Sequence, residues 1–536
     1  MKRASFVSLA VLLAANPACS TDVDESSGEP RSPDDGTGDS DGGETGAPPP
    51  DGGSGGSDDP PRDGDDDSSE ALVVPVALVP QAGAFGDERI NFGVPLSRGR
   101  LDDPGLIRVE ADGVELPAYV RPFAFYPDGS IRSVQIQIDV DIDAVTSVDV
   151  VVGAEAEAGS IEPVAVPDTL VSRDGTDGPR VWALFDPAYL AGTGLVGPVP
   201  ASSPEAGATL GAWSGVCNDD RYDTSRFLSD SGSRGAWLYD RPTAMYRLHA
   251  ITGELSPLRS AYREAHIYRS RISGSGSATR IGVPTAASDV KYHYTQGMAI
   301  TYLLSGDERL RERVEDVATR TSDLWRPAYV PGGRFWTERH AGFALLAYVW
   351  AARVSHDRRD DFIALADEAV DAYRDMQLTY PIGYTDPDAR CFSKESASAG
   401  ESYGYEGCSP WLSAILADGL EDYAAERGGE RAELARDSIV MLGRMLARDG
   451  VDPDGKPYYW LAGDGSRGVR DAYDEHYGEM PYVIAMAWHH DGRRDDSMRD
   501  VAEELIDNLA ARGVAPHTRS FNWQCRGAPL APLYLD

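Results

Sequence analysis

Five segments between residues 236 and 490 each open on polar or aromatic residues and continue with apolar residues at helical spacing. They are Trp237–Thr252, Tyr292–Leu304, Glu338–Ala352, Trp411–Ala425 and Glu479–His490. A more charged helix is predicted after each one, over Leu258–Arg271, Glu308–Trp325, Asp361–Met376, Arg431–Leu446 and Asp495–Ala511. Helical hairpins repeated in this way predict an (α/α) toroid of five or six hairpins over residues 236–512, with the apolar helices as its inner ring.

The starts of the apolar helices carry most of the polar and aromatic groups of this repeat. In a toroid these starts share one end of the ring, where backbone N–H groups and the positive ends of the helix dipoles point outward. We therefore expect a pocket for an anionic or sugar ligand at this end.

Residues 71–165 are predicted to be all-β. Short runs rich in Val and Ile alternate there with turn signals such as Asp112-Gly113 and Pro127-Asp128-Gly129. Such runs predict a small barrel or sandwich. The fold class is thus multidomain α+β, with a connecting region at 166–235 and a C-terminal tail at 513–536 expected to pack back as strands or coil.

The first 70 residues read as targeting sequence and tether. Lys2-Arg3 precedes the apolar run Phe6–Ala15, and Ala18-Cys19 is typical of a lipoprotein cleavage site. We expect residues 1–18 to be a signal peptide and Cys19 to be lipidated, which places the protein at the outer membrane or cell surface; ordinary secretion is the alternative. Residues 19–70 are predicted to be a disordered tether, because acidic and small residues dominate them.

The charge of the chain limits its partners. Residues 21–70 hold 17 acidic and two basic residues, a net charge of −15, and residues 71–536 carry −24 of the total −37. A body this acidic does not attract phosphates, which excludes nucleic acid as a partner. We expect a monomer that meets a membrane only through its lipid anchor and needs no cofactor, although calcium is possible at the acidic segments.

Four cysteines remain after Cys19, and an even number in an exported protein indicates two disulfides. Three pairings are possible. Cys391 with Cys408 would close a local loop, and Cys217 with Cys525 would then tie the two ends of the toroid together. The spacing matches no zinc motif.

Two groups of residues carry a family resemblance. The run 89–99, with Asp112-Gly113 and the run 126–132, resembles the N-terminal β-domain of exo-type rhamnogalacturonan lyases and their YetA-like relatives. The runs 292–297, 302–307 and 337–342 resemble helix starts in toroidal polysaccharide lyases. The resemblance implies a β-domain followed by an (α/α) toroid, and an enzyme that cleaves an acidic, uronate-containing polysaccharide or oligosaccharide by β-elimination.

Elimination beside a uronate needs a base for the C5 proton, a group that neutralises the carboxylate, and an acid for the leaving oxygen. At the second inner helix, His293 and Tyr294 are candidates for base or acid, and Tyr292 and Gln296 for substrate binding. Each of these side chains could instead pack on the adjoining loop.

The third and fifth inner helices supply the other titratable groups. An Arg in a first helical turn opposes the helix dipole, so Arg339 is predicted to neutralise the carboxylate rather than to cap the helix. His340, His476 and Tyr477 are the remaining candidates for acid–base or positioning roles. Candidates for substrate binding are Tyr239, Arg241, Glu338, Tyr405, Trp411, Glu475 and Glu479.

Two alternatives stay open. A glycoside hydrolase on the same scaffold would need two carboxylates across a cleft, which Asp240, Glu338, Glu406, Glu475 and Glu479 could provide. A glycan-binding surface lipoprotein without catalytic activity would use the same aromatic residues for stacking alone.

Overall fold

The structure is a computed structural model that describes residues 71–199, 216–217, 223–284, 288–473, 475–515 and 517–536. The predicted signal peptide, the acidic tether and the lipidation of Cys19 lie outside these residues. Among the helices described, none has the length and apolar character needed to cross a lipid bilayer.

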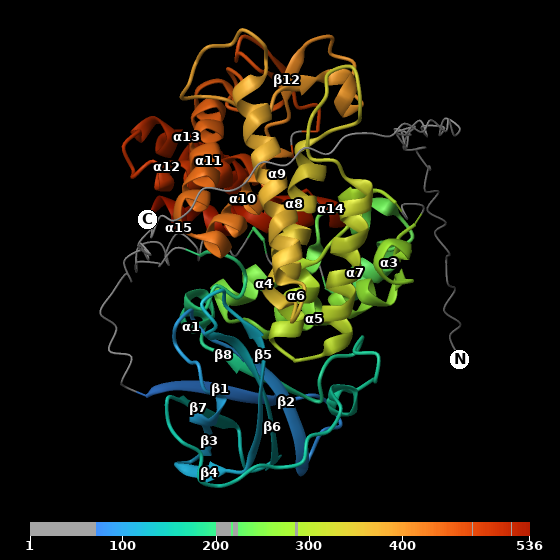
Figure 1. Cartoon of the computed structure of the whole chain (residues 1–536), viewed down its shortest axis with the longest axis vertical. Helices are drawn as coiled ribbons and strands as arrows, with labels where there is room; N and C mark the ends of the chain where they lie inside the picture. The colour runs from blue at the N-terminus through green and yellow to red at the C-terminus, as the bar shows by residue number, and fades with distance from the viewer. Residues whose placement is uncertain (1–70, 200–215, 218–222, 285–287, 474, 516) are drawn as a thin grey trace, which may run out of the picture. The chain divides into compact units, whose positions relative to one another are not determined.

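Two antiparallel sheets confirm the predicted N-terminal β-domain, which has the form of a sandwich (Figure 1). The five-stranded sheet has the order β4-β3-β7-β1-β8 and the three-stranded sheet the order β2-β6-β5. Their strands are β1 Leu72–Pro80, β2 Asp87–Pro95, β3 Ile107–Ala111, β4 Val114–Leu116, β5 Ala118–Phe125, β6 Ile131–Asp141, β7 Ser147–Val152 and β8 Val181–Phe185. β8 comes from the predicted connecting region and pairs with β1, so the sheet draws on residues beyond 165.

Strand β6 is buried on both faces over most of its length. One face carries aliphatic side chains such as Val134 and Ile136, which enter the sandwich core. The other face carries Ser133 and Gln135. The Ser133 hydroxyl donates to the carbonyl of Leu303 at the end of an inner helix, so this polar face joins the sheet to the helical domain.

Five helical hairpins follow, as the sequence predicts. The inner helices are α4 Arg241–Thr252, α6 Gln296–Leu303, α8 Glu338–Val354, α10 Ser413–Arg427 and α12 Glu479–His490. The outer helices are α5 Leu255–Ser270, α7 Glu308–Leu324, α9 Arg359–Thr379, α11 Gly429–Asp449 and α13 Asp496–Arg512. The inner helices are buried almost all round, whereas the outer ones alternate buried and exposed positions as amphipathic helices do.

The C-terminal tail closes the ring. Neighbouring inner helices contact one another in the order α4, α6, α8, α10 and α12, and α14 (Thr518–Gly527) contacts both α12 and α4. α15 (Ala531–Leu535) also packs on α12. The expectation of strands or coil after residue 512 is therefore wrong: these residues form helices and complete the toroid with a sixth inner helix.

The centre of the ring is filled by ion pairs rather than left open. Asp418 of α10 accepts from Arg247 of α4 at 2.6 Å and from Arg526 of α14 at 2.8 Å. One turn further along α10, Asp422 pairs with Arg353 of α8 at 2.8 Å. All five side chains are buried, so the ring has a polar core at this level.

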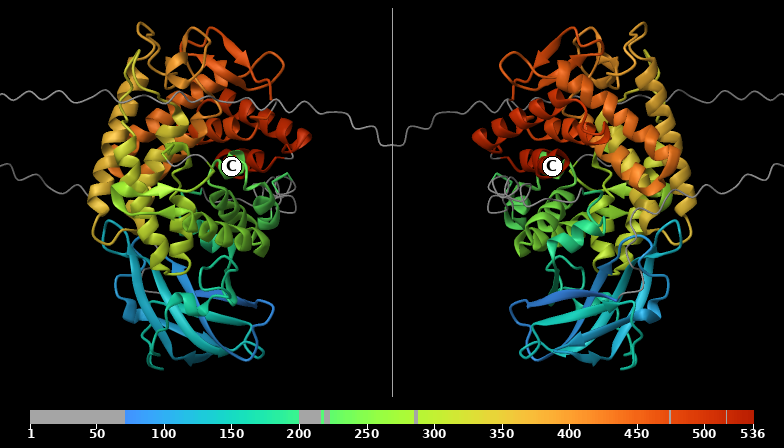
Figure 2. Two further views of the ribbon diagram at one scale, coloured as in Figure 1. Left: turned by 90° about the vertical axis from the view of Figure 1, so that its right-hand side faces the viewer. Right: turned by 90° about the vertical axis from the view of Figure 1, so that its left-hand side faces the viewer.

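The two ends of the ring meet different structures. The last turns of the inner helices face the β-domain, where Glu426 pairs with Arg132 of β6. A small sheet covers the first turns, as Figure 2 shows. Its strands, in the order β11-β12-β13-β14, are Lys394–Glu395, Glu406–Cys408, Tyr458–Ala462 and Gly468–Arg470. The sheet includes the long loop predicted around residues 379–410.

The four cysteines form two disulfides, as expected, in one of the three possible pairings. Cys391–Cys408 closes part of the long loop, and Cys217–Cys525 ties α14 to the connecting region. The second bond spans 308 residues of sequence. It therefore constrains the unfolded chain strongly and helps hold the sixth inner helix in the ring.

Candidate functional site

The first turns of the inner helices, together with the small sheet, bring seven side chains into one group, which we call the N-terminal cluster. Its members come from the start of α4, from α8, from the start of α10, from β13, from the start of α12 and from α14. They are Tyr239, Arg339, Trp411, Tyr459, His476, Glu479 and Trp523.

Tyr239 and Arg339 are joined directly. The guanidinium of Arg339 donates a hydrogen bond of 2.9 Å to the phenol oxygen of Tyr239. The positive charge of Arg339 therefore stabilises negative charge on that oxygen. The predicted Arg at the start of α8 thus faces the cluster rather than solvent alone.

The backbone at Tyr239 is held in an uncommon conformation. Tyr239 and Asp240 have φ values of 73° and 48°, in the left-handed region, which costs on the order of 1–3 kcal/mol for a residue with a side chain. The Tyr239 amide donates to the phenol oxygen of Tyr294 at 2.9 Å, and Tyr294 donates in turn to the carbonyl of Lys291. These bonds fix where the Tyr239 ring enters the cluster.

Trp411 and His476 form the centre of the cluster. Their rings stack at 4.2 Å with an angle of 12° between planes, and Trp523 and Tyr459 lie around them. Nδ1 of His476 lies 3.2 Å from Oε1 of Glu479. Burial raises the pKa of Glu479, although its contact with His476 opposes this.

Most of the cluster is buried, and its accessible edge is polar. Tyr239 is 1% exposed and Trp411 is 7% exposed, whereas Arg339 and Tyr459 are half-buried. Arg339 and Tyr459 are therefore the more accessible members of the cluster.

Two predicted histidines face other partners. Nδ1 of His293 lies 2.8 Å from the hydroxyl of Thr321 on α7, so its ring points to the outer helix and not to the cluster. Burial lowers the pKa of His293 to about 3. His340 stands between Asp289, 2.9 Å from its Nε2, and the hydroxyl of Thr337, 2.6 Å from its Nδ1. Both ring nitrogens of His340 are thus engaged, and burial lowers its pKa despite Asp289.

Several predicted substrate-binding residues have structural partners. Arg241 forms an ion pair of 2.7 Å with Glu264 of α5. Gln296 lies in the polar core of the ring, where its side chain bonds Arg526 and Asp422. The carbonyl of Tyr292 accepts a hydrogen bond from Tyr268 at 2.5 Å, which anchors the start of α6.

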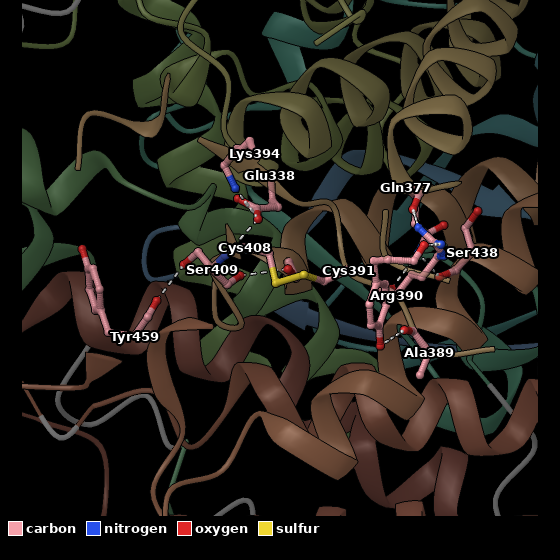
Figure 3. Close-up of a disulfide and its surroundings, with 12 residues drawn as sticks. Glu338, Gln377, Ala389, Arg390, Cys391, Lys394, Cys408, Ser409, Ser438 and Tyr459 are labelled. Atoms are coloured by element: carbon pink, nitrogen blue, oxygen red, sulfur yellow. Dashed lines mark hydrogen bonds and ion pairs between the residues drawn. A yellow bond between two sulfur atoms is a disulfide. The ribbon is translucent and has the colours of Figure 1, made fainter. Parts of the chain in front are cut away.

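Glu338 is buried beside a disulfide. Its Oε1 accepts from Nζ of Lys394 at 2.6 Å and from the amide of Ser409 at 2.9 Å (Figure 3). Glu338 and Lys394 are both 0% exposed. Ser409 directly follows Cys408, so these contacts attach the disulfide-closed loop to the first turn of α8.

The last predicted residues lie outside the N-terminal cluster and have other partners. Tyr477 packs against Arg512 of α13, with the guanidinium 4.8 Å from its ring centre. Glu475 accepts from the hydroxyl of Ser520 at 3.4 Å. Tyr405 lies on the small sheet, where Arg467 covers its ring at 3.8 Å.

The sequence reasoning missed two members of the cluster. Trp523 lies in a tail for which no helix is predicted. The nearby Cys525 could have indicated that a disulfide holds this segment against the ring. Tyr459 lies on β13, inside a stretch between two helices to which no role is assigned. Its contact with Trp411, at 5.6 Å between ring centres, depends on the fold of the small sheet.

The described residues contain no group of three His, Cys, Asp or Glu side chains placed to hold a metal ion. Asp474, an acidic residue shortly before α12, lies outside the described residues.

The ring of six inner helices, with polar and aromatic groups gathered at one end, makes the helical part of the chain an (α/α) toroid. Several solved structures align with the chain, among them three that are each 11% identical to it. A polysaccharide lyase gives a TM-score of 0.42 and covers 62% of this chain and 97% of its own. A family 88 glycosyl hydrolase from Bacteroides vulgatus gives 0.44 and covers 61% and 99%. A cellobiose 2-epimerase from Bacillus thermoamylovorans gives 0.38 and covers 57% and 85%.

TM-scores this low do not identify an activity for this chain. No family model matches the sequence, and no curated protein matches it. The resemblance to exo-type rhamnogalacturonan lyases stays a prediction.

Proposed function

We propose that this chain is a carbohydrate-active enzyme, a polysaccharide lyase that cleaves a uronate-containing glycan by β-elimination at the N-terminal cluster. The observation that carries the proposal is the hydrogen bond between Arg339 and the Tyr239 oxygen, set among aromatic rings and beside His476. A base with a cation at its side, a second titratable group and stacking surfaces are what this reaction needs.

The residues are given the following roles. Tyr239, as its phenolate, removes the proton at C5, and Arg339 neutralises the carboxylate on that carbon. The C5–H and C4–O bonds break, a C4=C5 double bond forms, and the leaving oxygen takes a proton from His476, which Glu479 orients. No water is consumed, so the product carries an unsaturated uronate.

Hydrolysis is less well supported, because two of the carboxylates it would use are already engaged. Asp240 accepts from the Thr243 hydroxyl and the Gly297 amide, and Glu338 is held by Lys394. Glu479 lies beside His476, and Asp471 is near enough to raise the pKa of Glu479. Hydrolysis requires two opposed carboxylates, and these contacts do not place Asp240 and Glu338 as such a pair.

The test is incubation of the protein with a panel of uronate glycans. A rise in the ultraviolet absorbance of an unsaturated uronate supports elimination. New reducing ends without this absorbance would show hydrolysis. Binding with neither signal would show a glycan-binding protein without catalytic activity.

Export belongs to this proposal as well. A polysaccharide is met outside the cell, and a signal peptide with a lipidated Cys19 would hold the enzyme at the surface. Mass spectrometry of the N-terminus of the mature protein tests this: a diacylglyceryl group on Cys19 supports it, and an unprocessed Met1 contradicts it.

A further inference from the structure

A surface cavity of about 260 Å³ lies on the small sheet, outside the N-terminal cluster. It is bordered by the start of β12 and by the turn that joins β13 to β14. Six of its lining residues matter here: Pro381, Tyr405, Glu406, Asp464, Ser466 and Arg467.

The turn between β13 and β14 shapes this cavity. The amide of Ala462 donates to the carbonyl of Arg467, and the amide of Gly463 donates to the carbonyl of Glu406 on the neighbouring strand. Asp464 accepts from both the amide and the hydroxyl of Ser466. These backbone and side-chain bonds fix the turn, so its polar groups are held in place before a ligand arrives.

Arg467 reaches back from this turn over the ring of Tyr405, 3.8 Å from its centre. Among the residues that the structure describes, no carboxylate lies within ion-pair distance of Arg467. Its guanidinium is exposed and keeps N–H donors for a ligand. Tyr405 and Arg467 thus form one wall that offers both a flat surface and hydrogen-bond donors.

The other groups of the cavity are acceptors. Glu406 and Asp464 supply carboxylate oxygens against a single guanidinium. Such a surplus of negative charge disfavours an anionic ligand and favours one with hydroxyl groups that donate to carboxylates. Tyr405 and Pro381 add apolar surface of the kind on which the C–H face of a sugar packs.

The cavity is linked to the N-terminal cluster by one strand. Tyr459, a member of the cluster, and Ala462, which lines the cavity, are both on β13, and three residues of strand span about 10 Å. Tyr403 lies alongside, 6.4 Å from Tyr405 and 5.7 Å from Trp460 between ring centres. Tyr403 thus connects Tyr405 of the cavity wall with Trp460, the residue next to Tyr459 on β13.

We infer that this cavity binds an uncharged sugar unit of the same oligosaccharide whose uronate unit occupies the N-terminal cluster. The link between the two rests on the proposed function; the cavity itself can be tested without it. A ligand that fills both the cavity and the N-terminal cluster must be longer than a disaccharide. The ligand is therefore an oligosaccharide of at least three units.

The test is isothermal titration calorimetry of the full chain with uncharged xylo-, cello- and galacto-oligosaccharides and with charged oligogalacturonides. We compare the wild type with Tyr405→Ala and Arg467→Ala. Arg470→Ala is the matched control, because Arg470 belongs to the same hairpin but pairs with Asp452 and Asp454 away from the cavity. Circular dichroism of each variant verifies that it folds.

We expect at least one uncharged series to bind and to weaken about five- to tenfold in Tyr405→Ala and in Arg467→Ala, the loss of one or two contacts. Arg470→Ala should bind as the wild type does. The inference is overturned if no uncharged probe binds, if both cavity variants bind like the wild type, or if Arg470→Ala weakens binding equally. A failed proposed function looks different: no substrate is cleaved, yet binding still depends on Tyr405 and Arg467.

Discussion

Arg339 and Tyr239, which stand 100 residues apart in the chain, meet through a hydrogen bond of 2.9 Å between guanidinium and phenol oxygen. Two helix starts on the ring have to come together for this contact to form. Arg339 is the second residue of α8, and Tyr239 precedes α4 in a left-handed backbone conformation. The Arg339 charge lies at the phenol oxygen of Tyr239, and the backbone of Tyr239 is strained. This pair is therefore the first to test for a catalytic role.

Replacing Tyr239 by Phe removes that oxygen and leaves the ring in place. If Tyr239 is the base, kcat should fall by about 10²- to 10⁴-fold while substrate binding changes little. Initial rates from the absorbance of the unsaturated product, with Kd from calorimetry, measure the two effects separately. Tyr473→Phe is the control, because Tyr473 is 52% exposed beside Tyr459 and has no role in the proposed chemistry. Full activity in Tyr239→Phe would exclude Tyr239 as the base.

Arg339→Gln tests the neutralising role. The wild type should cleave a free uronate substrate much faster than its methyl ester, because only the free carboxylate pairs with the guanidinium. The variant should lose about 10²- to 10³-fold in kcat/KM on the free acid and much less on the ester. The readout is the ratio of the two kcat/KM values, and an unchanged ratio would show that Arg339 does not contact the carboxylate.

The helical repeat and the presence of two disulfides could be predicted, because the first depends on local pattern and the second on an even number of cysteines. Glu479–His490 is helical over the range predicted, and α8 begins at Glu338 as expected. Apolar residues at helical spacing record which face is buried, and that information is present in a single segment.

The direction of individual side chains at helix starts could not be predicted. The second inner helix was expected from Tyr292, but residues Val290–Tyr292 form a 3₁₀ turn and α6 begins at Gln296. This shift turns His293 toward Thr321 of α7. The closure of the ring by α14 depends likewise on long-range packing and on the Cys217–Cys525 bond, which no local pattern in the tail records.

Stability should fall as the pH is lowered from neutral, because buried histidines stay uncharged in the fold. Burial lowers the pKa of His293, and also that of His266, to about 3, whereas an unfolded histidine titrates near 6.5. Between these values the unfolded chain binds protons that the folded chain does not. The free energy of unfolding therefore decreases with falling pH, by about 1.4 kcal/mol per pH unit for each histidine.

Urea denaturation at several pH values between about 7.5 and 4.5 measures this slope. His293→Asn, whose amide can still bond Thr321, should reduce the slope by about 1.4 kcal/mol per pH unit whatever its effect at neutral pH. His517→Asn is the control, since His517 is exposed. Equal slopes in the wild type and in His293→Asn would contradict the assignment.

Gly342→Ala should loosen the contact that holds two parts of the cluster together. A Cβ at position 342 of α8 would lie 2.5 Å from the backbone of Ile415 on α10, and backbone of a packed helix cannot yield as a side chain can. Overpacking of this kind costs about 1–3 kcal/mol, against a gain of about 1 kcal/mol in helix propensity. We expect a net loss of stability in urea, and a loss of activity as well, because α8 carries Arg339 and α10 follows directly on Trp411.

Gly192→Ala, where a Cβ would meet nothing within 4 Å, should be neutral or slightly stabilising. If both variants unfold at the same urea concentration as the wild type, the close approach of α8 and α10 is not a feature of the folded protein. The proposed positions of Arg339 and Trp411 in the cluster would then be wrong.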